Sequence, residues 1–221
     1  GARFVRADRT EAHAYDEITV QDWDLVVEIS WQPAMVAQAL DALAGRAKAW
    51  AMISSCSVYA RNDEPGADES AELLAPLNAE RADVQDYGEA KVACEQFTTG
   101  ATDHRALLLR AGLIGGDGDV SDRTGYWPGR FALAAGGPVL VPADRHGSVQ
   151  IIDVCDLADF TLHAGLAGRS GAVNVVGERV DLARALELSA DAAAADGTSP
   201  AEIVTAEQDW LTAHDVQPWA G

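Results

Sequence analysis

Apolar and polar positions follow two different periods along the chain, which predicts strands and helices in alternation. Short continuous apolar runs are typical of buried parallel strands, and such strands are predicted over 2–8, 24–30, 49–55, 105–112, 148–154 and 171–177. Apolar residues at helical spacing predict helices over 33–47, 82–100, 155–168, 180–196 and 206–214, and another around 128–135. Pro33 suits the first turn of its helix, and Gly100 suits the C-terminal end of the next one.

Alternating strands and helices with short connections indicate an α/β fold with a parallel, Rossmann-like sheet. Two stretches break the pattern: the polar loop 59–82 and the irregular, glycine-rich segment 113–148. A chain of 221 residues accommodates a main domain with a smaller lobe. We expect a nucleotide-binding domain formed by 1–115, with 148–170 returning to it. The substrate-binding lobe is then formed by 116–147 and 171–221.

Charge and cysteine content narrow the function classes. The chain has 16 basic and 35 acidic residues, a net charge of −19 that repels nucleic acid and anionic membrane surfaces. No apolar run reaches membrane-spanning length, and the opening lacks a charged-then-apolar leader. Three separated cysteines without a CxxC pair, and scattered histidines, predict neither a disulfide framework nor a metal site. These features favour a reducing, cytoplasmic setting.

The clearest candidate chemistry is a serine cluster upstream of a tyrosine–lysine pair. Ser55 and Ser57 lie at the carboxyl end of a predicted parallel strand, the edge where α/β sheets bind ligands. Tyr87 and Lys91 are four residues apart on a predicted helix and therefore share one face. An ammonium favours the phenolate and lowers the pKa of a tyrosine, while a serine hydroxyl can polarise a carbonyl. Hydride transfer at a carbonyl needs such acid–base help at the oxygen.

Structural roles are the alternatives for these residues. Tyr87 could belong to an ordinary amphipathic helix with Lys91 solvated, and the serines could form a polar turn that closes a strand. Cys56, inside the serine turn, is better explained as an inert thiol than as a nucleophile, because no histidine is near it in sequence. Trp127 could line a substrate pocket or simply pack within the lobe.

Five segments in order resemble the extended short-chain dehydrogenase/reductase family, and within it the NAD-dependent epimerase/dehydratase group and its reductase-like members. The segments are ISSCSVYA, YGEAK, LLLRAGLIGG, VQIIDVCDLADF and VNVVG. The resemblance covers most of residues 2–177, and the five segments in this order are much more specific than any one of them.

The resemblance implies roles for individual residues. Tyr87 matches the catalytic tyrosine, Lys91 matches the lysine that holds the nicotinamide ribose, and Ser55 matches the hydroxyl donor to the substrate carbonyl. Ser57 is the second candidate for that donor and is expected to contact the substrate. The implied cofactor-binding residues are Asp8, Ile29, Ser30, Lys91, Ala111, Gly112 and Leu113. Substrate contacts are expected at Tyr126, Trp127 and Arg130.

The resemblance also implies an activity. We expect an NAD- or NADP-dependent oxidoreductase or epimerase acting on a carbonyl or alcohol of a nucleotide-sugar-like small molecule. A homodimer through the Tyr-x-x-x-Lys helix and the helix before it is implied as well. Dehydratase chemistry is disfavoured, because Cys56 and Ser57 occupy the positions of that group's acid pair. The alternatives are a non-catalytic dinucleotide-sensing or RNA-associated member of the same fold, and an inactive fragment.

One departure from the family is an absence. The family opens with a strand, a Gly-rich turn and a helix whose N-terminus takes the pyrophosphate, and no such opening is present. We therefore expect the chain to be part of a longer protein and to begin at the third strand of the nucleotide-binding sheet. The glycine-rich stretch 112–118 follows a strand, but Asp117, Asp119 and Asp122 make it a poor phosphate cradle.

Overall fold

The computed structural model describes residues 2–61, 63–121, 123–195, 197, 199 and 201–216. The chain divides into a larger unit, 1–112 and 156–175, and a smaller unit, 113–155 and 176–221. Residues 171–175, expected in the substrate-binding lobe, form a strand of the larger unit's sheet. Each unit is described separately below.

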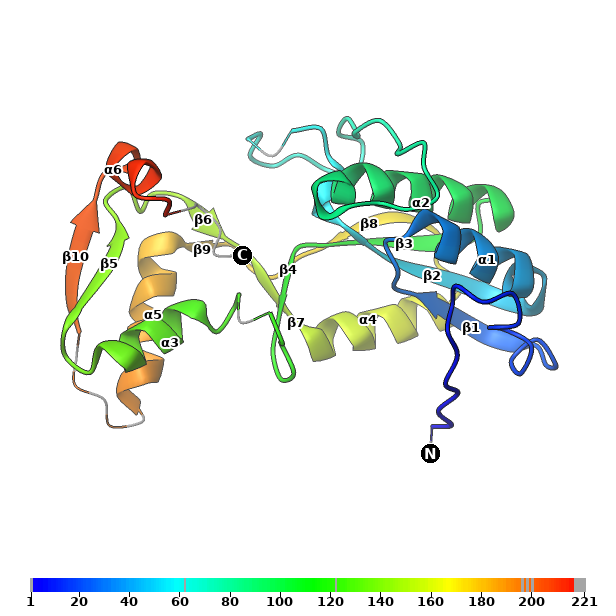
Figure 1. Cartoon of the computed structure of the whole chain (residues 1–221), viewed down its shortest axis with the longest axis horizontal. Coiled ribbons are helices and arrows are strands. Elements are labelled where there is room, and N and C mark those ends of the chain that lie inside the picture. The colour runs from blue at the N-terminus through cyan, green and yellow to red at the C-terminus, as the bar shows by residue number, and fades with distance from the viewer. Residues whose placement is uncertain are drawn as a thin grey trace. The chain divides into compact units, whose positions relative to one another are not determined.

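The larger unit is built on a four-stranded parallel sheet, which confirms the predicted α/β class (Figure 1). Its strands are β1 (Trp23–Glu28), β2 (Ala47–Ser55), β3 (Ala106–Ala111) and β8 (Gly171–Val175), hydrogen-bonded in the order β1-β2-β3-β8. Every pairing is parallel, and Ser54 and Ser55 lie opposite Arg110 and Ala111 at the carboxyl end of β2. The strands predicted over 24–30, 49–55 and 105–112 are thus β1, β2 and β3.

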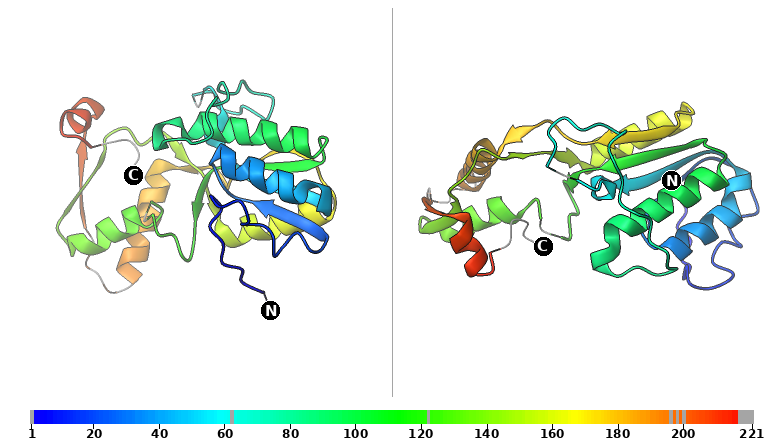
Figure 2. Two further views of the ribbon diagram at one scale, coloured as in Figure 1. Left: turned by 45° about the vertical axis from the view of Figure 1, so that its right-hand side comes forward. Right: turned by 90° about the horizontal axis from the view of Figure 1, so that it is seen from above.

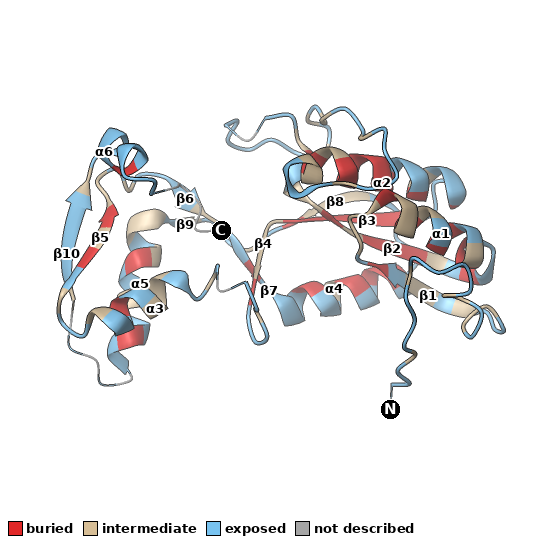
Figure 3. Ribbon diagram, viewed as in Figure 1, coloured by how far each residue is buried: buried red, intermediate tan, exposed pale blue. Residues whose placement is uncertain are grey.

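Helices cover both faces of this sheet. α1 (Pro33–Leu43) and α2 (Tyr87–Ala101) lie side by side on one face, and α4 (Val154–Leu166) lies on the other (Figures 1 and 2). Because side chains alternate across a strand, Val26 and Met52 pack with the core under α1, while Leu25 meets α4 at Gly165. Figure 3 shows the buried residues concentrated in the sheet and on the helix faces toward it.

Local signals explain most helix boundaries. Pro33 opens α1, where the missing N–H of a proline costs no hydrogen bond. Gly100, expected at the C-terminal end of this helix, lies in the last turn of α2. The left-handed residues that end this helix are Asp103 (φ 51°) and His104 (φ 59°).

The strand predicted over 2–8 is wrong. These residues have no strand structure, and Arg3, Phe4, Arg6 and Asp8 are all exposed. A strand needs a ladder partner, and within the described residues β1 pairs only with β2. The segment that follows is attached by side chains instead: Arg9 forms a two-pronged ion pair with Glu28, with N···O distances of 3.0 and 2.6 Å.

The smaller unit has an entirely apolar core. β5 (Pro138–Pro142) and β10 (Glu202–Ala206) pair in parallel, and α3 (Tyr126–Ala134) packs with α5 (Leu182–Ala195). Its buried cluster consists of Phe131, Val139, Val141, Leu186 and Ala193. Two further strand pairs complete the unit, β4 (Leu113–Gly115) with β7 (Ile151–Asp153) and β6 (Ser148–Val149) with β9 (Val180–Asp181); α6 (Gln208–Ala213) follows β10.

Candidate functional site

The serine cluster lies at the carboxyl end of β2, and its members have different roles. Ser54 is buried and donates a 2.6 Å hydrogen bond to Glu95 Oε1 on α2. Ser55 caps the short helical turn Cys56–Val58, because its Oγ accepts from the Ser57 amide at 3.1 Å. Its hydroxyl also lies 3.1 Å from that of exposed Ser57. Two hydroxyls are therefore presented at the ligand-binding edge of the sheet.

α2 begins directly against this turn. A Cβ added at Gly88 would lie 2.5 Å from the backbone oxygen of Ser57, so only glycine permits the approach. Tyr87, the first residue of α2, precedes this contact. The Tyr87 ring lies 5.6 Å from the ring of Trp31, which follows β1 closely, and its centroid is 6.0 Å from Lys91 Nζ. The tyrosine and the lysine thus share one helix face, as predicted from their spacing.

Lys91 is buried and uses its ammonium on backbone carbonyls. Nζ donates to the oxygens of Ile53 at 2.7 Å, Ser30 at 3.1 Å and Ile29 at 3.4 Å. These three carbonyls come from the carboxyl ends of β1 and β2, so the predicted cofactor-binding stretch Ile29–Ser30 lies beside the lysine. An ammonium has three protons, and each has a carbonyl within reach.

Burial lowers the pKa of Lys91 from its ordinary 10.5 to about 8. The neighbouring Cys94, Glu28 and Glu95 act in the opposite direction. Lys91 is therefore mostly a cation at neutral pH. Positive charge beside a phenol favours its anionic form, which is the property an acid–base tyrosine needs.

Other predicted residues lie in different settings. Asp8 lies in an exposed coil, and its carboxylate accepts from Thr10, whose hydroxyl and amide lower the pKa of Asp8. Ala111 is buried at the end of β3, and the Gly112 amide donates to Val175 O at 3.1 Å. Leu113 begins β4 and belongs to the smaller unit.

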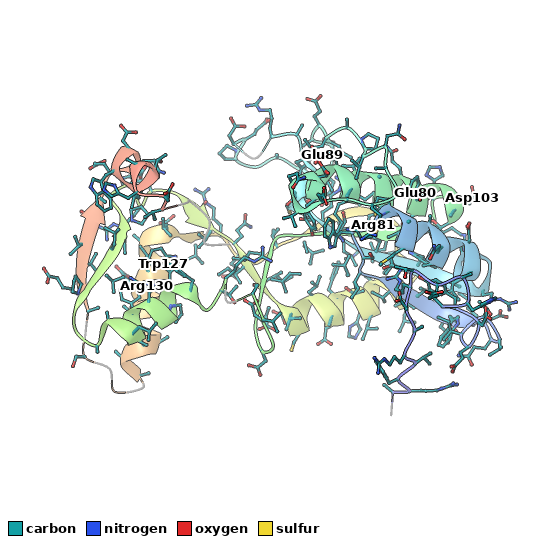
Figure 4. All side chains as sticks on the ribbon, viewed as in Figure 1. Glu80, Arg81, Glu89, Asp103, Trp127 and Arg130 are labelled. Atoms are coloured by element: carbon teal, nitrogen blue, oxygen red, sulfur yellow. The ribbon has the colours of Figure 1, made fainter. Side chains whose placement is uncertain are left out.

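The predicted substrate residues on α3 all belong to the smaller unit. Two of them, Trp127 and Arg130, are labelled in Figure 4. The rings of Tyr126 and Trp127 meet edge to face at 5.1 Å. Trp127 packs against the apolar core of that unit, whereas Arg130 is exposed. Packing is thus an observed role of Trp127, and its role in substrate binding stays a prediction.

The sequence did not predict a buried polar network behind the serines. Glu95 lies one turn beyond Lys91 on α2 and forms a buried ion pair with Arg110 of β3, at 2.9 Å. The signal for this pair was a charged residue inside the apolar run LLLRAG. Trp31 was missed as well, because an aromatic residue in a turn carries no periodic signal.

Cys56 and the glycine-rich stretch 112–118 lie in surroundings that disfavour a nucleophile and a phosphate site, respectively. Burial raises the pKa of the Cys56 thiol, which lies 3.4 Å from the Arg110 carbonyl oxygen, so a thiolate is disfavoured. A Cβ at Gly116 would lie 3.0 Å from a carboxylate oxygen of Asp153, and the Asp119 carboxylate is held by Ser121 and Thr124. Carboxylates around the turn repel a phosphate.

The described residues offer neither a metal site nor a membrane-spanning helix. No three His, Cys, Asp or Glu side chains there gather in a group suited to a metal ion. No described helix combines the length and apolar character needed to cross a bilayer.

Comparison with known proteins gives a clear fold. No family model and no curated protein matches the sequence. A provisionally assigned epimerase from Burkholderia cenocepacia J2315 matches with a TM-score of 0.70 and 17 % identity, over 98 % of this chain and 78 % of that one. RMD from Pseudomonas aeruginosa, solved with NADPH, matches with a TM-score of 0.69 and 21 % identity, over 92 % of this chain and 73 % of that one. UDP-glucuronic acid 4-epimerase from Bacillus cereus, solved with NAD, matches with a TM-score of 0.63 and 16 % identity, over 99 % of this chain and 76 % of that one. The chain shares the fold of NAD(P)-dependent epimerases and reductases.

Proposed function

We propose that the chain carries the acid–base centre of an NAD(P)-dependent oxidoreductase or epimerase acting on a carbonyl or alcohol of a nucleotide-sugar-like small molecule. The observation that carries the proposal is the placement of Tyr87 and Lys91 on one face of α2. The ammonium lies at the carboxyl ends of β1 and β2, and the start of the helix packs on the serine turn. Neighbours in structure named as UDP-sugar epimerases suggest the substrate class.

The residues present suit the nicotinamide end of a dinucleotide. Lys91 would hold the ribose hydroxyls, and the backbone at Ile29 and Ser30 would lie along the cofactor. When bound, a nicotinamide cofactor supplies or accepts the hydride. Ser55 would donate to the substrate oxygen and fix its position. Tyr87 would give its proton to that oxygen in reduction, or take it from the alcohol in oxidation, while Lys91 stabilises the phenolate.

Turnover of matched variants tests the proposal. We expect Tyr87→Phe to abolish cofactor-linked turnover of a panel of nucleotide sugars, followed by cofactor absorbance and by chromatography of the sugar products. Tyr15→Phe is the matched control, because it also removes a half-buried phenol hydroxyl, one that accepts from Arg9 at 2.8 Å. Full turnover by Tyr87→Phe would exclude the mechanism.

A second candidate is a non-catalytic dinucleotide-binding protein. One observation favours it: the ammonium of Lys91 already donates to three backbone carbonyls. On this view Lys91 is a strut between strand ends. Cofactor binding without hydride exchange, across the same substrate panel, would support this candidate over the enzyme.

A further inference from the structure

Arg110 is a buried charge at the carboxyl end of β3, and it is almost fully engaged. Nε and Nη2 donate to the two carboxylate oxygens of Glu95, at 3.1 and 2.9 Å. Both side chains of this pair are 5 % exposed. Such a two-pronged contact fixes the orientation of both groups as well as their separation.

The Glu95 carboxylate extends this contact to the catalytic side of the sheet. Its Oε1 also accepts from Ser54 Oγ at 2.6 Å, and Ser54 immediately precedes Ser55. Glu95 lies four residues after Lys91 on α2, on the same helix face. One carboxylate therefore ties together the end of β2, the end of β3 and the helix that carries Tyr87 and Lys91.

The other end of the guanidinium holds the loop that follows the serine turn. Nη1 donates to the Tyr59 hydroxyl and to the Glu69 carbonyl oxygen, both at 3.1 Å. Tyr59 in turn donates to Asn174 Oδ1 at 2.6 Å, and the backbone N–H of Asn174 donates to the Glu69 carboxylate at 2.6 Å. Residues 59–73 are thus attached to β3 and β8 through Arg110 and Asn174.

We propose that Arg110 is a positioning residue that seats α2 and the loop 59–73 together at the carboxyl edge of the sheet. The inference rests on the proposed function, since that function defines what is being positioned. Arg110 contacts Glu95 through Nε and Nη2 but Tyr59 and Glu69 through Nη1, so the single nitrogen of a lysine would keep the charge without reaching both sets of acceptors. Buried ion pairs are often replaceable by apolar residues without loss of stability, which favours a role in geometry.

The chain has only two lysines, so the side-chain titration of Lys91 can be measured directly as a report on the seating of α2. In protein labelled with ¹⁵N-lysine, Lys91 gives one side-chain signal and exposed Lys48, paired with Asp24, gives the other; Lys48→Arg assigns them. We expect Lys91 to titrate near 8 in the wild type and to move toward 10.5 in Arg110→Lys, as α2 shifts and water reaches the ammonium. Lys48 is expected to stay unchanged.

Variants that each remove one hydrogen bond of this network separate positioning from general destabilisation, and hydrogen exchange measures their effects. Tyr59→Phe should raise exchange in 59–73 and leave α2 unchanged, whereas Ser54→Ala should raise exchange in α2 and leave 59–73 unchanged. Arg110→Lys should raise both. If Arg110→Lys does not fold, the two mild variants still decide. An even rise across the larger unit, or an unmoved Lys91 titration in folded Arg110→Lys, would overturn the proposal.

These measurements need no cofactor and no turnover. Full activity of Tyr87→Phe would therefore remove the proposed function while leaving the coupling of α2 and the loop intact as a physical result. Once turnover is established, Tyr59→Phe should raise KM several-fold with little change in kcat, because it disturbs only the loop. If Tyr59→Phe and Ser54→Ala changed KM and kcat to the same extent, the loop contacts and the α2 contacts of Arg110 would not act separately.

Discussion

The two units of the chain differ in what their cores contain. Eight polar or charged residues are buried among those described, and all of them belong to the larger unit: Glu28, Ser54, Lys91, Glu95, Thr98, Thr102, Arg110 and Thr161. The buried cluster of the smaller unit is apolar throughout. Burying polar groups costs free energy unless each finds a partner, and here the partners are specific.

The core of the smaller unit is therefore stabilised by apolar burial, whereas the larger unit also uses buried polar contacts to position side chains. The smaller unit is held by apolar area, which any well-fitting set of side chains provides. The larger unit accepts the desolvation of Lys91, Glu95 and Arg110, and it places their contacts at the ligand-binding edge of its sheet. Buried charge thus marks the region where precise placement matters, and the predictions below test that distinction in order of expected effect.

The largest expected effect is on activity. Tyr87→Phe and Lys91→Met should each lower kcat/KM by about 10²–10⁴-fold, since each removes acid–base help at the reacting oxygen. Lys48→Met is the matched control for Lys91→Met, because Lys48 is exposed and pairs only with surface acids. Equal losses in the two lysine variants would indicate that charge, rather than the site, sets the rate.

The next effect concerns the buried ion pair. Arg110→Met alone leaves the Glu95 carboxylate buried without its cation and should cost about 3–5 kcal/mol of unfolding free energy. Glu95→Leu combined with Arg110→Met should recover most of that stability, while hydrogen exchange in 59–73 stays raised. Urea denaturation and exchange measure the two outcomes. A double variant as unstable as the single one would show that the pair serves cohesion after all.

The same division decided what the sequence could predict. β2 and β3 contain continuous apolar runs, so their burial on both faces was visible in one dimension, whereas β1 has the shorter run LVV and leaves Val27 exposed. Tyr87, Lys91 and Ser55 were visible because helical spacing and a strand end place them. The short strands β5 and β10 were missed, because VLV and EIVTA are too short to distinguish from loop.

Pairing between distant segments could not be predicted from one sequence. Arg110 appeared as a charge in an apolar strand, but its partner Glu95 lies on a helix and its loop contacts lie at 59 and 69. The predicted strand 2–8 failed for the opposite reason: its pattern was suitable, but no described strand pairs with it. Periodicity therefore predicts elements, while burial of polar groups depends on which elements meet.

The pH dependence of stability reports the cost of burying Lys91. Its folded pKa of about 8 lies below the 10.5 of the unfolded chain, so above pH 8 the unfolded state binds more protons and stability rises with pH. The rise should be about 1 kcal/mol per pH unit at first and absent in Lys91→Met. The clean window ends below pH 9, because burial raises the pKa of the Cys56 thiol and raises that of Cys94 from 9.0 to about 12, and both titrations act in the opposite sense. Stability that falls within this window would contradict a buried ammonium.

The smallest expected effect lies in the apolar core of the smaller unit. Leu186 is 1 % exposed, but Leu186→Met conserves volume and leaves no polar group unpaired, so it should cost less than about 1.5 kcal/mol. Hydrogen exchange in peptides from each unit reads the effect locally, which matters because two units need not unfold together. Arg110→Lys is the matched conservative change in the larger unit and should loosen its surroundings far more. If Leu186→Met disturbed its unit as much as Arg110→Lys disturbs the other, the apolar core would be as exacting as the charged one, and buried charge would no longer mark the functional region.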